Sequence, residues 1–190
     1  MKKKSLEKEE EIYRVVLEIT AEVGLAGLKM SDIAKQAGLA HGTVYIYFKN
    51  KRDLINSLFK KVKTKAAISI GTGKVIDGNF FEILKELWKG YIAYLIHNQQ
   101  ETHFLRQCME SPFLEESSKE VSDESRKNLI TFFEKGKQEG YVKGMDTELL
   151  MSVFSGLAKD VVDKINNDTL NFSDQLITDS FDLCWHAIRR

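Results

Sequence analysis

Residues 30–48 constrain the fold of this chain more than any other stretch, because they predict two short helices joined by a tight turn. Ala34 supplies a small side chain where two steeply crossing helices must approach, and Gly38 supplies a turn residue that adopts positive φ at little cost. Val44 is the aliphatic residue by which the second helix, residues 42–48, can face the first. The other apolar residues on this buried side are Ile33, Ala37 and Leu39. This pattern is typical of a helix-turn-helix.

The opposite side of this second helix carries groups that suit a nucleic acid. Hydroxyl, phenol and imidazole groups can donate to phosphates and touch base edges, and here they belong to His41, Thr43, Tyr45 and Tyr47. Asn50 can cap the next helix, with Asp53 as its partner in a capping box. Lys51 then lies at a helix N-terminus, where the helix dipole favours an anion. A helical hairpin inside an ordinary all-α core is the alternative interpretation.

The charge of the chain is divided unevenly along its length. The 190 residues hold 28 Lys and Arg against 28 Asp and Glu, so the net charge is zero. Residues 1–65 hold 14 basic and 8 acidic side chains, a net of +6, and residues 66–190 hold 14 and 20, a net of −6. A basic head on an acidic body is expected when only one end of a protein meets a polyanion.

Residues 12–58 resemble the N-terminal domain of the tetracycline-repressor (TetR) family of transcriptional regulators. The matching positions are Gly24, Asp32, Ile33, Ala34, Ala37, Gly38, Gly42, Thr43, Val44, Tyr45, Tyr47, Phe48, Lys51 and Leu54. The resemblance implies DNA contacts from Ser31, His41, Gly42, Thr43, Tyr45, Tyr47 and Lys51. This chain has Leu28, Lys29 and Ala40 where the family usually has Ser or Thr before its second and third helices, so we expect both helices to start without a side-chain cap.

The remainder of the chain is predicted to be all-α, because apolar residues recur at helical spacing and no strand alternation is present. The predicted helices cover residues 5–23, 51–70, 80–100, 102–111, 124–139, 146–166 and 173–189. We expect a helix-turn-helix domain over residues 1–50, a connecting helix over 51–70, and a helical regulatory and dimerisation domain over 71–190. Three glycines in residues 71–79 predict a hinge at the start of that second domain.

Several classes of protein are disfavoured by the sequence. Cys108 and Cys184 lie far apart with no CxxC, and no His pair has ligand spacing, so we expect buried thiols and no metal or other cofactor. Paired carboxylates with a partner, a nucleophile elbow and an HExxH motif are all missing, which argues against an enzyme. No signal peptide and no apolar run of membrane-spanning length is found, and we expect a cytoplasmic location.

The aromatic residues of the second domain allow two interpretations. They are core residues of a helical bundle, or some of them line a pocket for a small molecule. The resemblance implies an inducer pocket in this region, for an apolar or aromatic ligand. The candidate lining residues are Trp88, Tyr91, Tyr94, His103, Phe104, Gln107, Cys108, Phe133 and Phe154.

The last two predicted helices, residues 146–166 and 173–189, combine wide apolar stripes with small residues that permit close helix packing, within one chain or across a two-fold axis. The resemblance implies that these helices form the interface of a homodimer on a palindromic DNA operator. The hypothesis is therefore a bacterial, ligand-responsive transcriptional regulator, most simply a repressor that a small molecule releases. The alternative is a helical dimerisation or adaptor protein that touches no DNA. The inducer, the operator and the regulated genes stay open.

Overall fold

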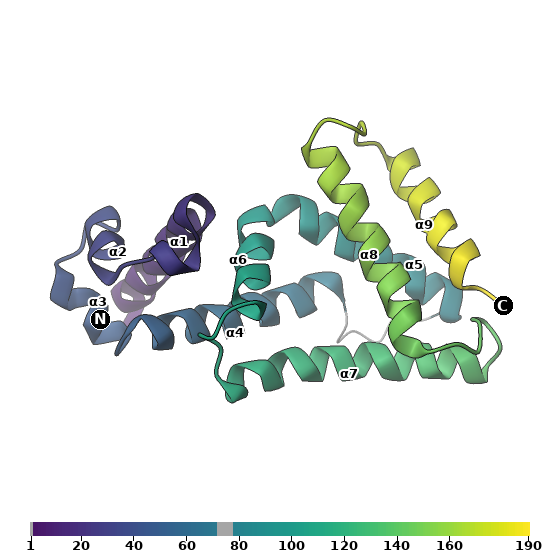
Figure 1. Cartoon of the computed structure of the whole chain (residues 1–190), viewed down its shortest axis with the longest axis horizontal. Coiled ribbons are helices and arrows are strands. Elements are labelled where there is room, and N and C mark those ends of the chain that lie inside the picture. The colour runs from purple at the N-terminus through teal and green to yellow at the C-terminus, as the bar shows by residue number, and fades with distance from the viewer. Residues whose placement is uncertain (1, 72–77) are drawn as a thin grey trace. The chain divides into compact units, whose positions relative to one another are not determined.

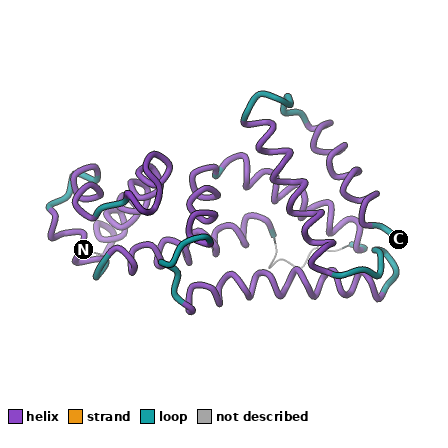
Figure 2. Tube along the Cα trace, in the orientation of Figure 1, coloured by secondary structure: helices purple, strands orange, loops and turns teal. Residues whose placement is uncertain are grey.

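The computed structural model describes residues 2–71 and 78–190, and every regular element within them is a helix (Figures 1 and 2). The helices are α1 (Lys2–Gly27), α2 (Met30–Gln36), α3 (His41–Tyr47), α4 (Lys51–Ile70), α5 (Phe80–His97), α6 (Gln99–Met109), α7 (Glu116–Gln138), α8 (Thr147–Asn166) and α9 (Asp174–Ile188). An isolated bridge between Val142 and Arg189 is the sole β contact in this described part. The predicted all-α fold class is confirmed.

The chain forms two compact units. The N-terminal unit consists of residues 1–64 and 99–121, and the C-terminal unit of residues 65–98 and 122–190. These units differ from the sequence-based division at residue 71, because α6 and its flanking residues join the N-terminal unit. The physical reason is that α6 packs on α1 and buries Phe104 and Cys108 in the N-terminal core.

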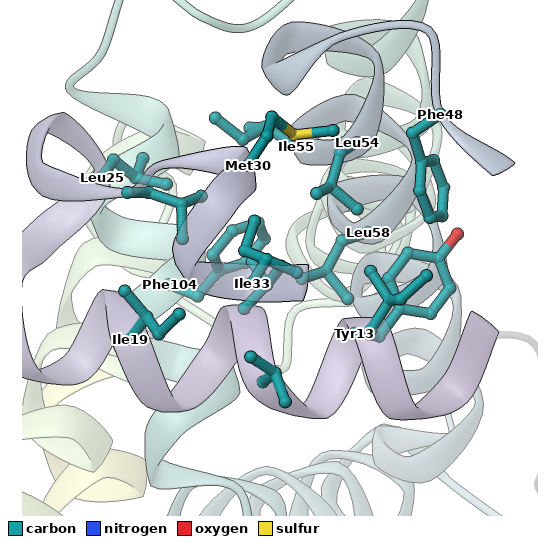
Figure 3. Packing of buried hydrophobic residues seen from close by; sticks show 14 of the residues in the cluster. Tyr13, Ile19, Leu25, Met30, Ile33, Phe48, Leu54, Ile55, Leu58 and Phe104 are labelled. Carbon is teal, nitrogen blue, oxygen red and sulfur yellow. The ribbon is translucent and has the colours of Figure 1, made fainter. Parts of the chain in front are cut away.

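The core of the N-terminal unit is mainly aliphatic (Figure 3). Each helix of the helix-turn-helix contributes to it through fully buried Ile33 of α2 and Val44 of α3. The largest shares come from α1 and α4, whose buried residues recur every three or four positions: Ile12, Val15, Val16, Ile19, Leu54, Ile55, Leu58 and Val62. This spacing puts one stripe of each helix toward the same core and leaves the polar residues outside.

In the C-terminal unit α5 packs against α8 and α9, and α8 packs against α9. Its core is rich in aromatic rings. Phe80 stacks on Phe132 with the ring centroids 4.4 Å apart, and Trp88 meets Phe154 edge-on at 5.3 Å. A Cβ at Gly136 would collide with the Phe80 ring, so that position requires glycine for the packing. Three helices start with side-chain caps, from Asn79 on α5, Asp146 on α8 and Ser173 on α9.

The predicted hinge over residues 71–79 lies mostly outside the described residues, although α4 ends at Ile70 and α5 begins at Phe80, at its two borders. Both cysteines are buried, as predicted, and burial raises the pKa of each thiol to about 12. Among the described residues, none of the helices combines the length and apolar character that a membrane span requires. The same residues contain no cluster of His, Cys, Asp and Glu able to hold a metal ion.

Candidate nucleic-acid interface

The turn between α2 and α3 has the geometry that the sequence predicts. Gly38 has φ of 65°, a conformation that residues with a side chain rarely adopt. The Gly38 N–H donates to the Lys35 carbonyl at 3.2 Å, and the Leu39 N–H donates to the Ala34 carbonyl at 2.9 Å. This pair of hydrogen bonds is a Schellman motif, which ends α2 and turns the chain sharply into α3.

Buried side chains fix the rotation of α3 about its own axis. Val44 is fully buried and packs in the same core as Ile33 and Ala34, while Ala37 and Leu39 are partly buried against that core. The roles predicted for these apolar positions are therefore confirmed. Because α3 has only seven residues and one buried anchor, the face opposite Val44 has to point away from the unit.

Four residues of α3 are exposed: His41, Gly42, Tyr45 and Ile46. Gly42 and Ile46 lie opposite Val44. The His41 ring meets the Tyr45 ring edge-on, with centroids 5.2 Å apart, and 44% of Tyr45 is exposed. Thr43 is half-buried, as is Tyr47, which packs against the N-terminal core. The structure thus brings the predicted residues of α3 together on one small helix, with Tyr47 at the edge of its open face.

The starts of α2 and α3 lack side-chain caps, as expected from the sequence. Lys29 and Ala40 are their N-cap residues, and neither makes a side-chain capping hydrogen bond. Ser31 lies in the first turn of α2, where it is exposed and its hydroxyl donates to a carboxylate oxygen of Asp32 at 3.2 Å. Ser31 is therefore exposed on α2 and does not serve as its helix cap.

The start of α4 is capped reciprocally. The Asn50 side-chain oxygen accepts from the Asp53 N–H at 2.9 Å, and an Asp53 carboxylate oxygen accepts from the Lys49 N–H at 2.8 Å. The predicted capping box is present, with Asp53 reaching one residue further back than in the usual motif. These bonds hold the chain between α3 and α4 in one conformation.

Lys51 makes contacts that the sequence did not predict. Its ammonium donates to the Ala26 carbonyl at 3.2 Å and lies 4.9 Å from the centre of the Phe113 ring. Partial burial lowers the pKa of Lys51 below its usual value. The side chain thus ties the start of α4 to the end of α1 and to the segment after α6, all within the N-terminal unit.

Three exposed residues beside the predicted set were missed by the sequence interpretation. They are Lys29, Ile46 and Lys49. Helical periodicity could have identified Ile46, because a residue two positions after buried Val44 lies on the opposite side of the helix. The two lysines belong to a basic segment, residues 24–65, which contains nine Lys or Arg residues and two Asp residues. A net charge of +7 over this segment favours contact with a polyanion.

Four of the nine candidate ligand residues lie in the N-terminal unit, on α6. Phe104 and Cys108 are fully buried in its core. The Gln107 amide oxygen accepts from the Leu25 N–H at 2.7 Å and its nitrogen donates to the Thr20 carbonyl at 3.4 Å. His103 contacts the Gln107 amide nitrogen at 2.5 Å.

Gln107 therefore bridges a break in α1. Gly24 has φ of 72° and ψ of 170°, so the helix is interrupted there, as the predicted end of the first helix at residue 23 implied. The interruption leaves backbone groups on either side that a continuous helix would pair internally. The amide of Gln107 replaces that pairing.

The other five candidate ligand residues lie in the C-terminal unit: Trp88, Tyr91, Tyr94, Phe133 and Phe154. Phe154 is the centre of this group, with Trp88 edge-on, Tyr91 stacked at 6.1 Å and Phe133 edge-on at 6.2 Å. Tyr94 is buried on α5. The nine residues thus fall into two groups, one in each unit. In the second group Trp88 Nε1 is buried with no hydrogen-bond partner, and burial raises the pKa of Tyr91 to about 12.

A helical chain whose first unit contains a helix-turn-helix, with exposed residues on α3 and a basic segment over residues 24–65, has the architecture of a DNA-binding transcriptional regulator. The chain belongs to the tetracycline-repressor family. Residues 12–58 match the model of bacterial regulatory proteins of the tetR family, and residues 59–190 match the tetracyclin repressor-like C-terminal domain. The family consists of transcriptional regulators and not of enzymes, so this chain is a transcriptional regulator.

Similar proteins support the assignment over different lengths. A TetR family transcription regulator from Marinobacter aquaeolei VT8 superposes with a TM-score of 0.91 at 20% identity, over 100% of this chain and 99% of that one. The fatty acid metabolism regulator protein of Bacillus subtilis is 51% identical over 51 residues, which are 27% of this chain and 26% of that protein. The structure of the Bacillus subtilis regulator FadR in complex with stearoyl-CoA has a TM-score of 0.70 at 25% identity, over 92% of this chain and 96% of that one.

Proposed function

We propose that this regulator is a homodimeric repressor that binds a palindromic operator through α3 and is released from it by a small apolar molecule. The observation that carries the proposal is the outward face of α3, held open by buried Val44 and by the Gly38 turn. A helix presented in this way fits the major groove of B-DNA.

The DNA contacts divide into two kinds. Ser31 of α2 and the first residues of α3 contact base edges: Ser31, His41, Gly42 and Thr43. Tyr45, Tyr47 and Lys51 mostly contact phosphates, which position the protein without carrying sequence information. The intramolecular contacts of Lys51 support this second role, because they hold its positive charge at the start of α4, where the helix dipole also attracts an anion.

The exposed faces of α8 and α9 support the dimer. On α8, exposed Leu149, Ser152 and Gly156 follow one stripe at helical spacing, and a Cβ at Gly156 would meet no atom within 4 Å. On α9, Leu183 is 66% exposed and lies one turn before exposed Ala187. An apolar stripe with small residues permits close packing against the same stripe of a second copy.

A fatty acyl thioester is the ligand class that the comparisons support. A stretch of 51 residues of this chain is 51% identical to a fatty acid metabolism regulator, and a regulator of similar fold was solved in complex with stearoyl-CoA. The aromatic group around Phe154 offers apolar surface and one buried donor without a hydrogen-bond partner, Trp88 Nε1. Such a ligand would shift the balance between DNA-binding and released conformations by its differential affinity for the two.

Repeated selection of duplexes from a random DNA pool by the full chain tests the proposal. We expect enrichment of one inverted repeat, a sedimentation mass of two chains, and release of the selected duplex by stearoyl-CoA but not by coenzyme A. A pool that stays random would favour the adaptor interpretation. Enrichment without release by stearoyl-CoA would retain the DNA-binding function and reject this ligand class.

A further inference from the structure

Ile46 occupies the centre of the face that α3 turns outward. Successive helical residues are about 100° apart, so Gly42 and Ile46 each lie about 200° from the buried anchor Val44. The two are one helical turn from each other. Ile46 is 80% exposed, the largest exposure of any large apolar side chain among the described residues. A Cβ at Gly42 would meet no atom within 4 Å.

This position is chemically unlike the rest of the open face. His41, Thr43 and Tyr45 carry polar atoms that can exchange hydrogen bonds with water or with base edges, whereas Ile46 has none. Contact with an apolar partner would remove the Ile46 hydrocarbon surface from water, which is favourable. The partner also has to suit a surrounding segment with a net charge of +7.

Duplex DNA offers one apolar group in its major groove, the 5-methyl of thymine. We infer that Ile46 is a specificity-determining residue that selects thymine in each operator half-site by contacting this methyl group. Gly42 assists, because the absence of a side chain one turn away lets a base pair approach the helix closely. The inference rests on the proposed DNA-binding function and names how one base is read.

Removal of the methyl group alone provides the test. In the duplex selected by the full-length wild type, each thymidine is replaced in turn by deoxyuridine, which keeps every hydrogen bond and loses only the methyl. We expect about a fourfold loss of wild-type affinity for each contacted methyl, at one symmetric position of each half-site. Ile46→Ala should bind the thymine duplex more weakly by a similar factor and should no longer distinguish thymine from uracil there.

A matched control is available on α4. Ile68 is 65% exposed, so Ile68→Ala removes the same surface apolar group away from α3 and should leave both affinities unchanged. Wild-type binding that is indifferent to uracil at every position would overturn the inference and leave the DNA-binding function intact. The inference also fails if Ile46→Ala still prefers thymine, because another side chain would then read the methyl. Wild type that binds no duplex at all would overturn the proposed function together with this inference.

Discussion

The two compact units of this chain pack their cores in different ways. The N-terminal core is built mainly from Ile, Val and Leu on short helices, with a positive-φ glycine at its turn. The C-terminal core is built around contacting aromatic rings, from Phe80 to Phe181. In the first unit, one buried residue on a seven-residue helix is enough to decide which side chains face outward. In the second, rings that fill the core and rings that would meet a ligand share the same neighbours, so packing does not distinguish the two roles.

The largest expected effect is a loss of stability of the N-terminal unit when the packing of α6 in its core is damaged. Phe104→Ala should destabilise the N-terminal unit by about 3–5 kcal/mol, because it empties a fully buried position in that core. Phe154→Ala is the matched change in the C-terminal core. Amide hydrogen exchange should report faster opening of α1 to α3 for the first variant and of α5 and α8 for the second. The same pattern of opening in both variants would contradict the division into two cores.

A smaller effect is expected at the turn. Gly38→Val should lower the free energy of unfolding by about 1–3 kcal/mol and abolish DNA binding, because a β-branched residue resists a φ of 65°. The cost is backbone strain and not a clash, since a Cβ there meets no atom within 4 Å. Gly144 also has open space for a Cβ but no positive φ, so Gly144→Val should melt as wild type does. Equal melting temperatures for the two variants would refute the strain argument.

The hydrogen bonds of Gln107 across the break in α1 should contribute about 1–3 kcal/mol to the free energy of unfolding. Gln107→Leu leaves the Leu25 N–H and the Thr20 carbonyl without their partner, and partly buried groups left unpaired are costly. Chemical denaturation of this variant, compared with Gln100→Leu at an exposed position of the same helix, measures the difference. If both variants were equally stable, solvent would be satisfying these backbone groups and the bridge would not matter.

The smallest expected effects separate charge from hydrogen bonding at the phosphates. Lys51→Ala should make the salt dependence of DNA affinity shallower by about 0.9 in log–log slope, because one cation fewer displaces counterions. Tyr47→Phe removes a neutral donor and should weaken binding without changing that slope. Both should affect all sequences alike. A change in the preferred sequence of Lys51→Ala would instead place this residue at a base edge.

The sequence was sufficient for the features that local chemistry decides. The local sequence pattern predicted the positive φ of Gly38, the burial of Val44 and the capping bonds of Asn50 and Asp53. Each of these features depends on neighbours within a few residues. The role of α6 could not be predicted in this way. Phe104 and Gln107 contact α1 more than 75 residues away in the chain, and the apolar spacing of a helix does not say which core it joins. The same limitation hid the contact between Lys51 and Phe113.

In the proposed function, the outward face of α3 binds duplex DNA and the C-terminal unit does not. Amide hydrogen–deuterium exchange of the full chain, with and without the selected duplex, measures this most directly. We expect slower exchange in peptides covering residues 30–53 when the duplex is present. Peptides covering the exposed faces of α8 and α9 should exchange at the same rate in both samples. Protection confined to the C-terminal unit, or no protection anywhere at saturating duplex, would show that α3 does not bind DNA.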